Sequence, residues 1–243
     1  MSGAKMLDIL DLFSLEHWEL SVPQIAVILE QPQSTVYRHL RVLKEKGYVM
    51  EAQAGVYKLG YRFLEKARMI RSQNSLASVA LPAMRVLTKE TEETAILTIA
   101  SDLVVICLER VESTMPIKVS AEIGQVLPLH AGASSKPLLA YMPEETVDLL
   151  HSRELLRKFA DNTIVDTELL KADLRRIRER GYAVSESEVD EQVLAYGAPI
   201  RDADGQVIAV LSIAGPVERL SQKAEAQLVS HLHQAVHEIQ TYL

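Results

Sequence analysis

The order of four short segments at the start of the chain constrains its fold more than any other feature of the sequence. Apolar residues recur with helical spacing in three successive stretches within about the first 45 residues. Ser21 and Pro23 mark the start of the second stretch, since serine caps a helix N-terminus and proline is tolerated in the first turn. Gly47 follows the third stretch, where glycine readily takes the left-handed conformation that ends a helix. We therefore predict three short helices packed together.

A β-hairpin is predicted directly after these helices. Residues 48–50 and 56–59 are rich in β-forming side chains, and the segment between them ends in Gly55, which is typical of a turn. Three helices followed by such a hairpin form a winged helix-turn-helix, in which the hairpin is the wing. We predict this domain over residues 1–60.

The third helix has the composition of a helix that reads DNA. Val36, Leu40 and Leu43 are predicted to point inward, while hydroxyl, amide and basic groups, with His39 among them, point outward. A helix fits the DNA major groove, arginine can donate two parallel hydrogen bonds to guanine, and hydroxyls bind phosphate oxygens. The predicted DNA contacts are Gln33, Ser34, Thr35, Tyr37, Arg38 and Arg41, with Lys58 on the wing and the two arginines reading bases.

The charge of the chain is divided unevenly. The net charge of −7 argues against a protein coated in nucleic acid. Residues 1–75, however, hold 10 basic and 8 acidic side chains, whereas the remainder holds 16 and 25. The N-terminal part is therefore the part suited to approach phosphate.

A second, larger domain is predicted beyond a linker helix. Residues 61–75 are expected to form the linker, and the boundary is placed at the polar segment 71–75, where the charge balance changes sign. Residues 76–243 alternate between strand and helix patterns without a strict β-α-β rhythm, which favours an α+β fold around a mostly antiparallel sheet. The predicted strands are 95–100, 103–108, 117–119, 182–185, 193–201 and 207–213, and the predicted helices are 76–91, 133–142, 144–151, 166–180 and 224–239.

The chain lacks the marks of secretion and membrane insertion. Its single cysteine, Cys107, cannot form an internal disulfide, and the first ten residues do not have the apolar core of a signal peptide. No apolar stretch approaches the ~20 residues that span a bilayer. We expect a reduced, cytoplasmic protein without a membrane partner.

The sequence offers little to support catalysis. It contains no nucleophile elbow, no phosphate-binding loop and no dinucleotide-binding glycine motif. His130 and Ser134 are four residues apart, and His233 and His237 share a helical face, but neither pair is completed by the further groups that catalysis or a tetrahedral metal site needs. We expect no catalytic residue, no metal and no cofactor.

Three groups of motifs together resemble the IclR family of bacterial transcription regulators. The first group is QSTVYRHL (33–40), LKEKGYV (43–49) and YKLG (57–60), the second is GQVLPLHA (124–131) leading into SKPLLA (135–140), and the third is RGYA (180–183), GAPI (197–200) and LSIAGP (211–216). Their order covers nearly the whole chain. The resemblance implies a DNA-reading domain, a linker helix and a GAF- or PAS-like domain that binds a small effector, assembled as a homodimer or homotetramer.

The resemblance also implies an effector pocket. By position in the shared motifs, its lining would be Val119, Leu127, Ala133, Ser134, Ser185, Val193, Ala195, Ser212 and Ala214. The chain departs from the family pattern, which often has cysteine at Ala195, an acid at Ser185 and glycine at Ser135. Its ligand is therefore expected to differ from the short acids that some members bind.

The resulting hypothesis is a DNA-binding regulator, a repressor of a catabolic operon, modulated by a small organic metabolite that carries a carboxylate. Free backbone N–H groups near Ala133–Ser135 would hold the carboxylate, and the Ser134 and Ser212 hydroxyls would assist. Lys136 either neutralises the ligand or lies at the surface. The alternative is a metabolic enzyme or small-molecule binding module whose N-terminal helices serve only oligomerisation.

Overall fold

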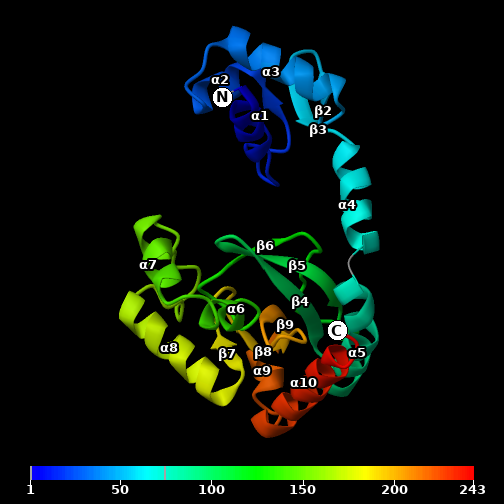
Figure 1. Cartoon of the computed structure of the whole chain (residues 1–243), viewed down its shortest axis with the longest axis vertical. Helices are drawn as coiled ribbons and strands as arrows, with labels where there is room; N and C mark the ends of the chain where they lie inside the picture. The colour runs from blue at the N-terminus through cyan, green and yellow to red at the C-terminus, as the bar shows by residue number, and fades with distance from the viewer. Residues whose placement is uncertain (1, 74) are drawn as a thin grey trace. The chain divides into compact units, whose positions relative to one another are not determined.

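The computed structural model describes residues 2–73 and 75–243, and the chain divides into two compact units between residues 74 and 75 (Figure 1). The predicted boundary at 71–75 includes Asn74, which lies outside the described residues. Within the described part of the chain, no helix is both long and apolar enough to cross a membrane.

The N-terminal unit is a winged helix-turn-helix followed by one further helix. Its small antiparallel sheet has the strand order β1-β3-β2, and apolar residues of the first three helices, such as Ile9, Ile25 and Leu40, pack against it. Its elements are α1 (Ser2–Asp11), β1 (Leu20–Ser21), α2 (Val22–Ile28), α3 (Gln33–Glu45), β2 (Val49–Gln53), β3 (Val56–Leu59) and α4 (Arg62–Gln73).

Local signals fix the start of α2 and the end of α3 as predicted. The Ser21 hydroxyl accepts a hydrogen bond from the backbone N–H of Gln24, and the Gln24 side chain accepts one from the backbone N–H of Ser21, which completes a capping box. Gly47 has a φ of 77° just beyond α3. The outer ends of the α2–α3 pair are therefore set by the residues that border them.

The C-terminal unit is built on a six-stranded sheet of strand order β6-β5-β4-β9-β8-β7, in which every neighbouring pair is antiparallel. This is the α+β architecture predicted from the sequence. Its elements are α5 (Ser75–Thr91), β4 (Thr94–Ser101), β5 (Val104–Val111), β6 (Val126–Pro128), α6 (Lys136–Ala140), α7 (Glu145–Ser152), α8 (Thr167–Arg180), β7 (Ala183–Glu186), β8 (Val193–Arg201), β9 (Val207–Pro216), α9 (Val217–Leu220) and α10 (Glu225–Gln240).

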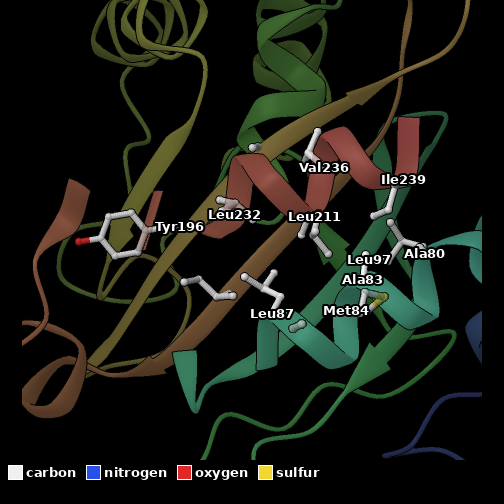
Figure 2. Packing of buried hydrophobic residues seen from close by; sticks show 14 of the residues in the cluster. Ala80, Ala83, Met84, Leu87, Leu97, Tyr196, Leu211, Leu232, Val236 and Ile239 are labelled. Carbon is white, nitrogen blue, oxygen red and sulfur yellow. The ribbon is translucent and has the colours of Figure 1, made fainter. Parts of the chain in front are cut away.

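Helices cover both faces of this sheet. Successive residues of a strand point to opposite faces, so neighbouring residues pack against different helices. Leu97 and Leu211 face the neighbouring helices α5 and α10, as Figure 2 shows. Ile96 and Val210, one position away on the same strands, face α6, α7 and α8. The sheet is therefore buried on both sides, which explains why the sequences of its central strands are almost entirely apolar.

Two predicted elements of this unit are wrong. Residues 117–119 form a loop rather than a strand, and the strand that pairs with β5 is β6 instead. The carbonyl oxygens of the loop accept hydrogen bonds from distant side chains: the Thr94 hydroxyl donates to Val119 (2.8 Å) and Arg219 Nη1 donates to Ile117 (3.0 Å). The helix expected from residue 133 begins only at Lys136, after a series of turns.

Candidate functional site

The outward side of α3 carries the groups predicted to contact DNA. Val36, Leu40 and Leu43 are buried against the other helices and the wing. The side chains of Gln33, Ser34, Tyr37, Arg38 and Arg41 are exposed, and those of Thr35 and, on β3, Lys58 are half-buried. The structure thus brings the six predicted α3 residues onto one helix, with the seventh on the wing.

His39 is the exception on α3, because it is buried rather than outward-facing. It is only 3% exposed, and no hydrogen-bond partner for its Nδ1 is present among the described residues. Burial lowers the pKa of His39, and the positive charges of Arg38 and Lys5 lower it further. His39 lies three residues after Val36 and four before Leu43, which places it on the buried face of the helix. The spacing therefore indicated burial, but the polar ring made an exposed position the natural prediction.

The wing is fastened to α3 by Glu51. The carboxylate of Glu51 forms an ion pair with Lys44 near the end of α3, and it also accepts a hydrogen bond from the backbone N–H of Gly55 (3.0 Å). On α3 itself, Arg41 pairs with Glu45 one turn later (3.0 Å), with both side chains exposed. The first pair joins the helix to the turn of the wing, while the second leaves the Arg41 guanidinium accessible.

The C-terminal unit contains a pocket on the sheet face that α6 and α8 cover. Its space is about 590 Å³, with the open mouth included. Residues of three segments surround it: the turn 131–135, the loop 119–127 and the loop 187–192, together with the sheet beneath. Eight of the nine residues that the family resemblance implied are at its wall: Val119, Leu127, Ala133, Ser134, Ser185, Val193, Ala195 and Ala214.

The ninth residue, Ser212, lies directly behind the wall. Its hydroxyl is 2.8 Å from the hydroxyl of Ser134 and donates to the carbonyl oxygen of Ile96 at 3.3 Å. Ser212 is completely buried, whereas Ser134 is half-buried at the pocket surface. Ser212 therefore orients the Ser134 hydroxyl and does not itself line the cavity.

Several wall residues were not predicted. Ser120 and Gln125 come from the segment between the predicted strand 117–119 and β6, and Glu188, Val189 and Asp190 come from the loop between β7 and β8. The acidic composition of that second loop, between two strands assigned to the pocket, was the available signal. The remaining unpredicted wall residues are Ile96, Ala121, Ala131, Gly132 and Ser135.

Lys136 is neither at the surface nor free to neutralise a ligand. It is 1% exposed, and its ammonium donates to Glu188 Oε1 (2.6 Å) and to Asp173 Oδ2 (2.8 Å). The expectation of a surface role is therefore wrong. The pocket wall holds no lysine or arginine among the described residues, so no basic side chain is available there to pair with an anionic ligand.

The turn 131–135 packs so tightly on the sheet that its position is fixed. A Cβ atom on Gly197 of β8 would lie 1.9 Å from the carbonyl oxygen of Ala133, so only glycine allows this approach. The Thr98 hydroxyl donates to the carbonyl oxygen of Ser134 (2.6 Å). Within the described residues, the backbone N–H groups of Ala133 and Ser134 make no hydrogen bond, which leaves two donors at the pocket.

The groups considered for enzyme chemistry are engaged elsewhere. His130 Nε2 lies 3.0 Å from the carbonyl oxygen of Arg157, and burial lowers the pKa of its ring. Cys107 is buried, and burial raises the pKa of its thiol to about 11, so that it remains a neutral, inert thiol. In residues 2–73 and 75–243, no cluster of three or more histidine, cysteine or acidic side chains could hold a metal ion.

Comparison with known proteins accounts for both units. The family model for the IclR helix-turn-helix domain matches residues 4–51, and the model for the C-terminal domain of the bacterial transcriptional regulator IclR matches residues 69–241. The HTH-type transcriptional regulator KipR of Bacillus subtilis is 30% identical over 218 residues, covering 90% of this chain and 87% of KipR. The transcriptional repressor IclR of Escherichia coli is 29% identical, covering 96% and 86%.

A solved structure extends the comparison to the whole fold. The crystal structure of an IclR homologue of Microbacterium hydrocarbonoxydans complexed with 4-hydroxybenzoate has a TM-score of 0.80 and 26% identity, covering 99% of this chain and 98% of that one. These relatives are transcription regulators rather than enzymes, which removes the alternative of a metabolic enzyme. With both family models together spanning most of its length, the chain belongs to the IclR family of DNA-binding bacterial transcription regulators.

Proposed function

We propose that this regulator is a repressor of a catabolic operon whose binding to operator DNA is controlled by a small organic molecule in the C-terminal pocket. The observation that carries the proposal is the convergence of eight family-implied residues on one cavity, together with the winged helix-turn-helix in the same chain. The Escherichia coli relative is named a transcriptional repressor, which supports the sign of regulation.

On the DNA side, α3 acts as the recognition helix. Arg38 and Arg41 read bases in the major groove, because their exposed guanidinium groups can each donate two hydrogen bonds to guanine. Ser34 and Thr35 contact phosphates near the helix N-terminus, and Lys58 places the wing on the backbone. We propose that a homodimer or homotetramer in the cytoplasm presents two such helices to a palindromic or directly repeated operator.

On the ligand side, the pocket suits a carboxylate on a partly apolar molecule. The unpaired N–H groups of Ala133 and Ser134 supply two donors in place of a basic side chain, and the Ser134 hydroxyl, held by Ser212, lies beside them. Val119, Leu127 and Val193 supply apolar wall. The Microbacterium relative holds 4-hydroxybenzoate, an aromatic carboxylate, which is compatible with this chemistry.

The control mechanism is a shift of population between states of different operator affinity. A ligand that binds one state better favours that state by its difference in affinity, and no other energy source is required. Repression is relieved if the ligand prefers the state that fits DNA poorly.

A two-stage ligand screen on the full chain tests the proposal. Organic acids, sugar acids and aromatic acids are first screened for a rise in melting temperature, and those that bind are added to operator-binding titrations. We expect at least one carboxylate to stabilise the protein and to weaken operator binding by about 5- to 150-fold, the usual range of allosteric coupling. Ser134→Ala should reduce the effect of that carboxylate. If no acid changes both properties, the effector proposal fails.

A further inference from the structure

A buried ionic cluster stands directly behind the pocket and joins three separate segments of the chain. It consists of Lys136 on α6, Asp173 on α8 and Glu188 in the loop between β7 and β8. The side chains are 1%, 15% and 8% exposed, respectively. Charged groups that are so withdrawn from water are costly unless they are paired, so the three depend on one another.

Glu188 connects this cluster to the pocket wall. Its Oε1 accepts from the Lys136 ammonium, while its Oε2 accepts from the backbone N–H of Gly132 at 3.0 Å. Gly132 also touches the same loop sterically, because a Cβ atom there would lie 3.1 Å from a methyl group of Val189. The carbonyl oxygen of Gly132 in turn accepts from the N–H groups of Ser135 and Lys136. One carboxylate thus links the loop to the turn that carries the two unpaired donors.

The loop 187–192 is anchored from its other side, so Glu188 is held in place from both directions. The Thr163 hydroxyl donates to the carbonyl oxygen of Glu188 (2.6 Å). The backbone N–H of Asn162 donates to the carbonyl oxygen of Ser187 (3.1 Å). The Asn162 side chain donates to the carbonyl oxygen of Glu186 (2.9 Å). Glu188 therefore reaches the turn from a loop that three hydrogen bonds tie to residues 162 and 163.

We propose that Lys136 is a positioning residue of the effector pocket, which it shapes without touching the ligand. By neutralising Glu188 and Asp173, it holds the Glu188 carboxylate against the Gly132 N–H and so fixes the turn 131–135 relative to the loop 187–192. Without the ammonium, the two carboxylates lose the positive charge that they share, and the link to Gly132 is lost as they move apart. This inference rests on the proposed effector function and assigns residues that control ligand affinity.

The test compares Lys136→Met with wild-type protein, using Lys171→Met as the matched control. Lys171 on α8 also contacts two acidic side chains, Asp148 and Glu168, but neither of them lines the pocket, whereas Glu188, a partner of Lys136, does. Hydrogen exchange of the full chain is measured first, followed by affinity for two probes, 4-hydroxybenzoate and succinate, and by operator affinity without a probe.

We expect amides of residues 131–135 to exchange at least tenfold faster in Lys136→Met, while amides of β8 and β9 keep their wild-type rates. Affinity for any probe that wild-type protein binds should fall at least tenfold, and operator affinity without a probe should stay within twofold. Lys136→Arg, which retains the charge, should recover part of the loss. Lys171→Met should behave like the wild type in both measurements.

Unchanged exchange at 131–135 in Lys136→Met would overturn the inference, and so would equally faster exchange throughout β8 and β9, which would indicate a general loss of stability. If Lys136→Met does not fold, Glu188→Gln, which keeps the side-chain size but removes one charge, gives the same exchange test. If wild-type protein binds neither probe, exchange alone decides the role of Lys136, and the failure concerns the proposed carboxylate effector instead.

Discussion

Single residues on α3 show how closely packing and DNA contact are interleaved. Val36 and Arg38 are two positions apart, yet Val36 is buried in the core and Arg38 is exposed on the side of α3 that we propose contacts DNA. The helical spacing of apolar residues was sufficient to predict this division. It was not sufficient for His39, whose polar ring masked its place among the buried positions, or for Lys136, whose partners lie 37 and 52 residues away. Partners that distant leave no trace in local spacing.

Replacing Arg38 tests base reading directly. Arg38→Ala should weaken binding to the cognate operator by about 1–3 kcal/mol, because a bidentate arginine–guanine contact is worth that much. Affinity for unrelated duplex should change far less. Fluorescence anisotropy with both duplexes measures the difference. Lys58→Ala serves as the comparison, since loss of a phosphate contact should weaken both duplexes alike; the same behaviour in Arg38→Ala would contradict base reading.

The pKa of His39 predicts a pH-dependent stability of the N-terminal unit. The pKa of His39 in the folded chain is below its ordinary value of 6.5, so the unfolded chain binds the proton more tightly. The free energy of unfolding should therefore have its full value above pH 6.5. It should fall as the pH drops from 6.5 toward the lowered pKa of His39. Urea unfolding monitored by Trp18, the only tryptophan of the chain, measures it. His39→Gln should flatten this dependence, and an equally steep dependence in that variant would assign it elsewhere.

Whole elements were predictable where their signals are local. Ser21, Asp166 and Gly181 define ends of α2 and α8 through bonds and backbone angles of their own neighbourhood. The loop around residue 117 was not predictable in the same way, because Thr94 and Arg219, which hold its carbonyl groups, are remote in sequence. The same holds for the pocket: residues of its strands, of the turn 131–135 and of the segment 119–127 were predicted, but none of the loop 187–192 was.

The contact between the turn 131–135 and β8 predicts a sensitive glycine. Gly197→Ala should destabilise the protein by roughly 1–3 kcal/mol or more, the usual cost of overpacking, because the new methyl group would meet the carbonyl oxygen of Ala133. Chemical denaturation of both variants measures it against Gly3→Ala, where no atom lies within 4 Å of the new Cβ. Equal stability of the two variants would show that the turn can move away freely.

At the scale of the whole molecule, two units of opposite charge balance carry separate tasks. Residues 1–75 have a net charge of +2, and the remainder has −9, so the N-terminal part is the one whose charge favours phosphate. The pocket belongs entirely to the C-terminal unit. Control of DNA binding must therefore act as a coupling free energy between two distinct sites.

Such coupling is reciprocal, which gives a prediction independent of the operator assay. If a ligand weakens operator binding by a given factor, saturating operator DNA should weaken ligand binding by the same factor. Isothermal titration of the ligand into protein with and without operator duplex measures this second factor. An unrelated duplex of the same length controls for charge. Ligand affinity that ignores the operator, despite a ligand effect on DNA binding, would be inconsistent with a simple population shift.

The salt dependence of operator binding tests the central claim most directly, namely that the basic face of α3 and the wing grip duplex DNA. Neutralised phosphates release counterions, so the logarithm of the affinity should fall linearly with the logarithm of the salt concentration. Even two neutralised phosphates imply a loss of about tenfold between about 50 and 200 mM salt. We predict at least this slope with operator duplex and a steeper loss than for Lys58→Ala. A flat response, or equal affinity for operator and scrambled duplex at every salt concentration, would contradict the account.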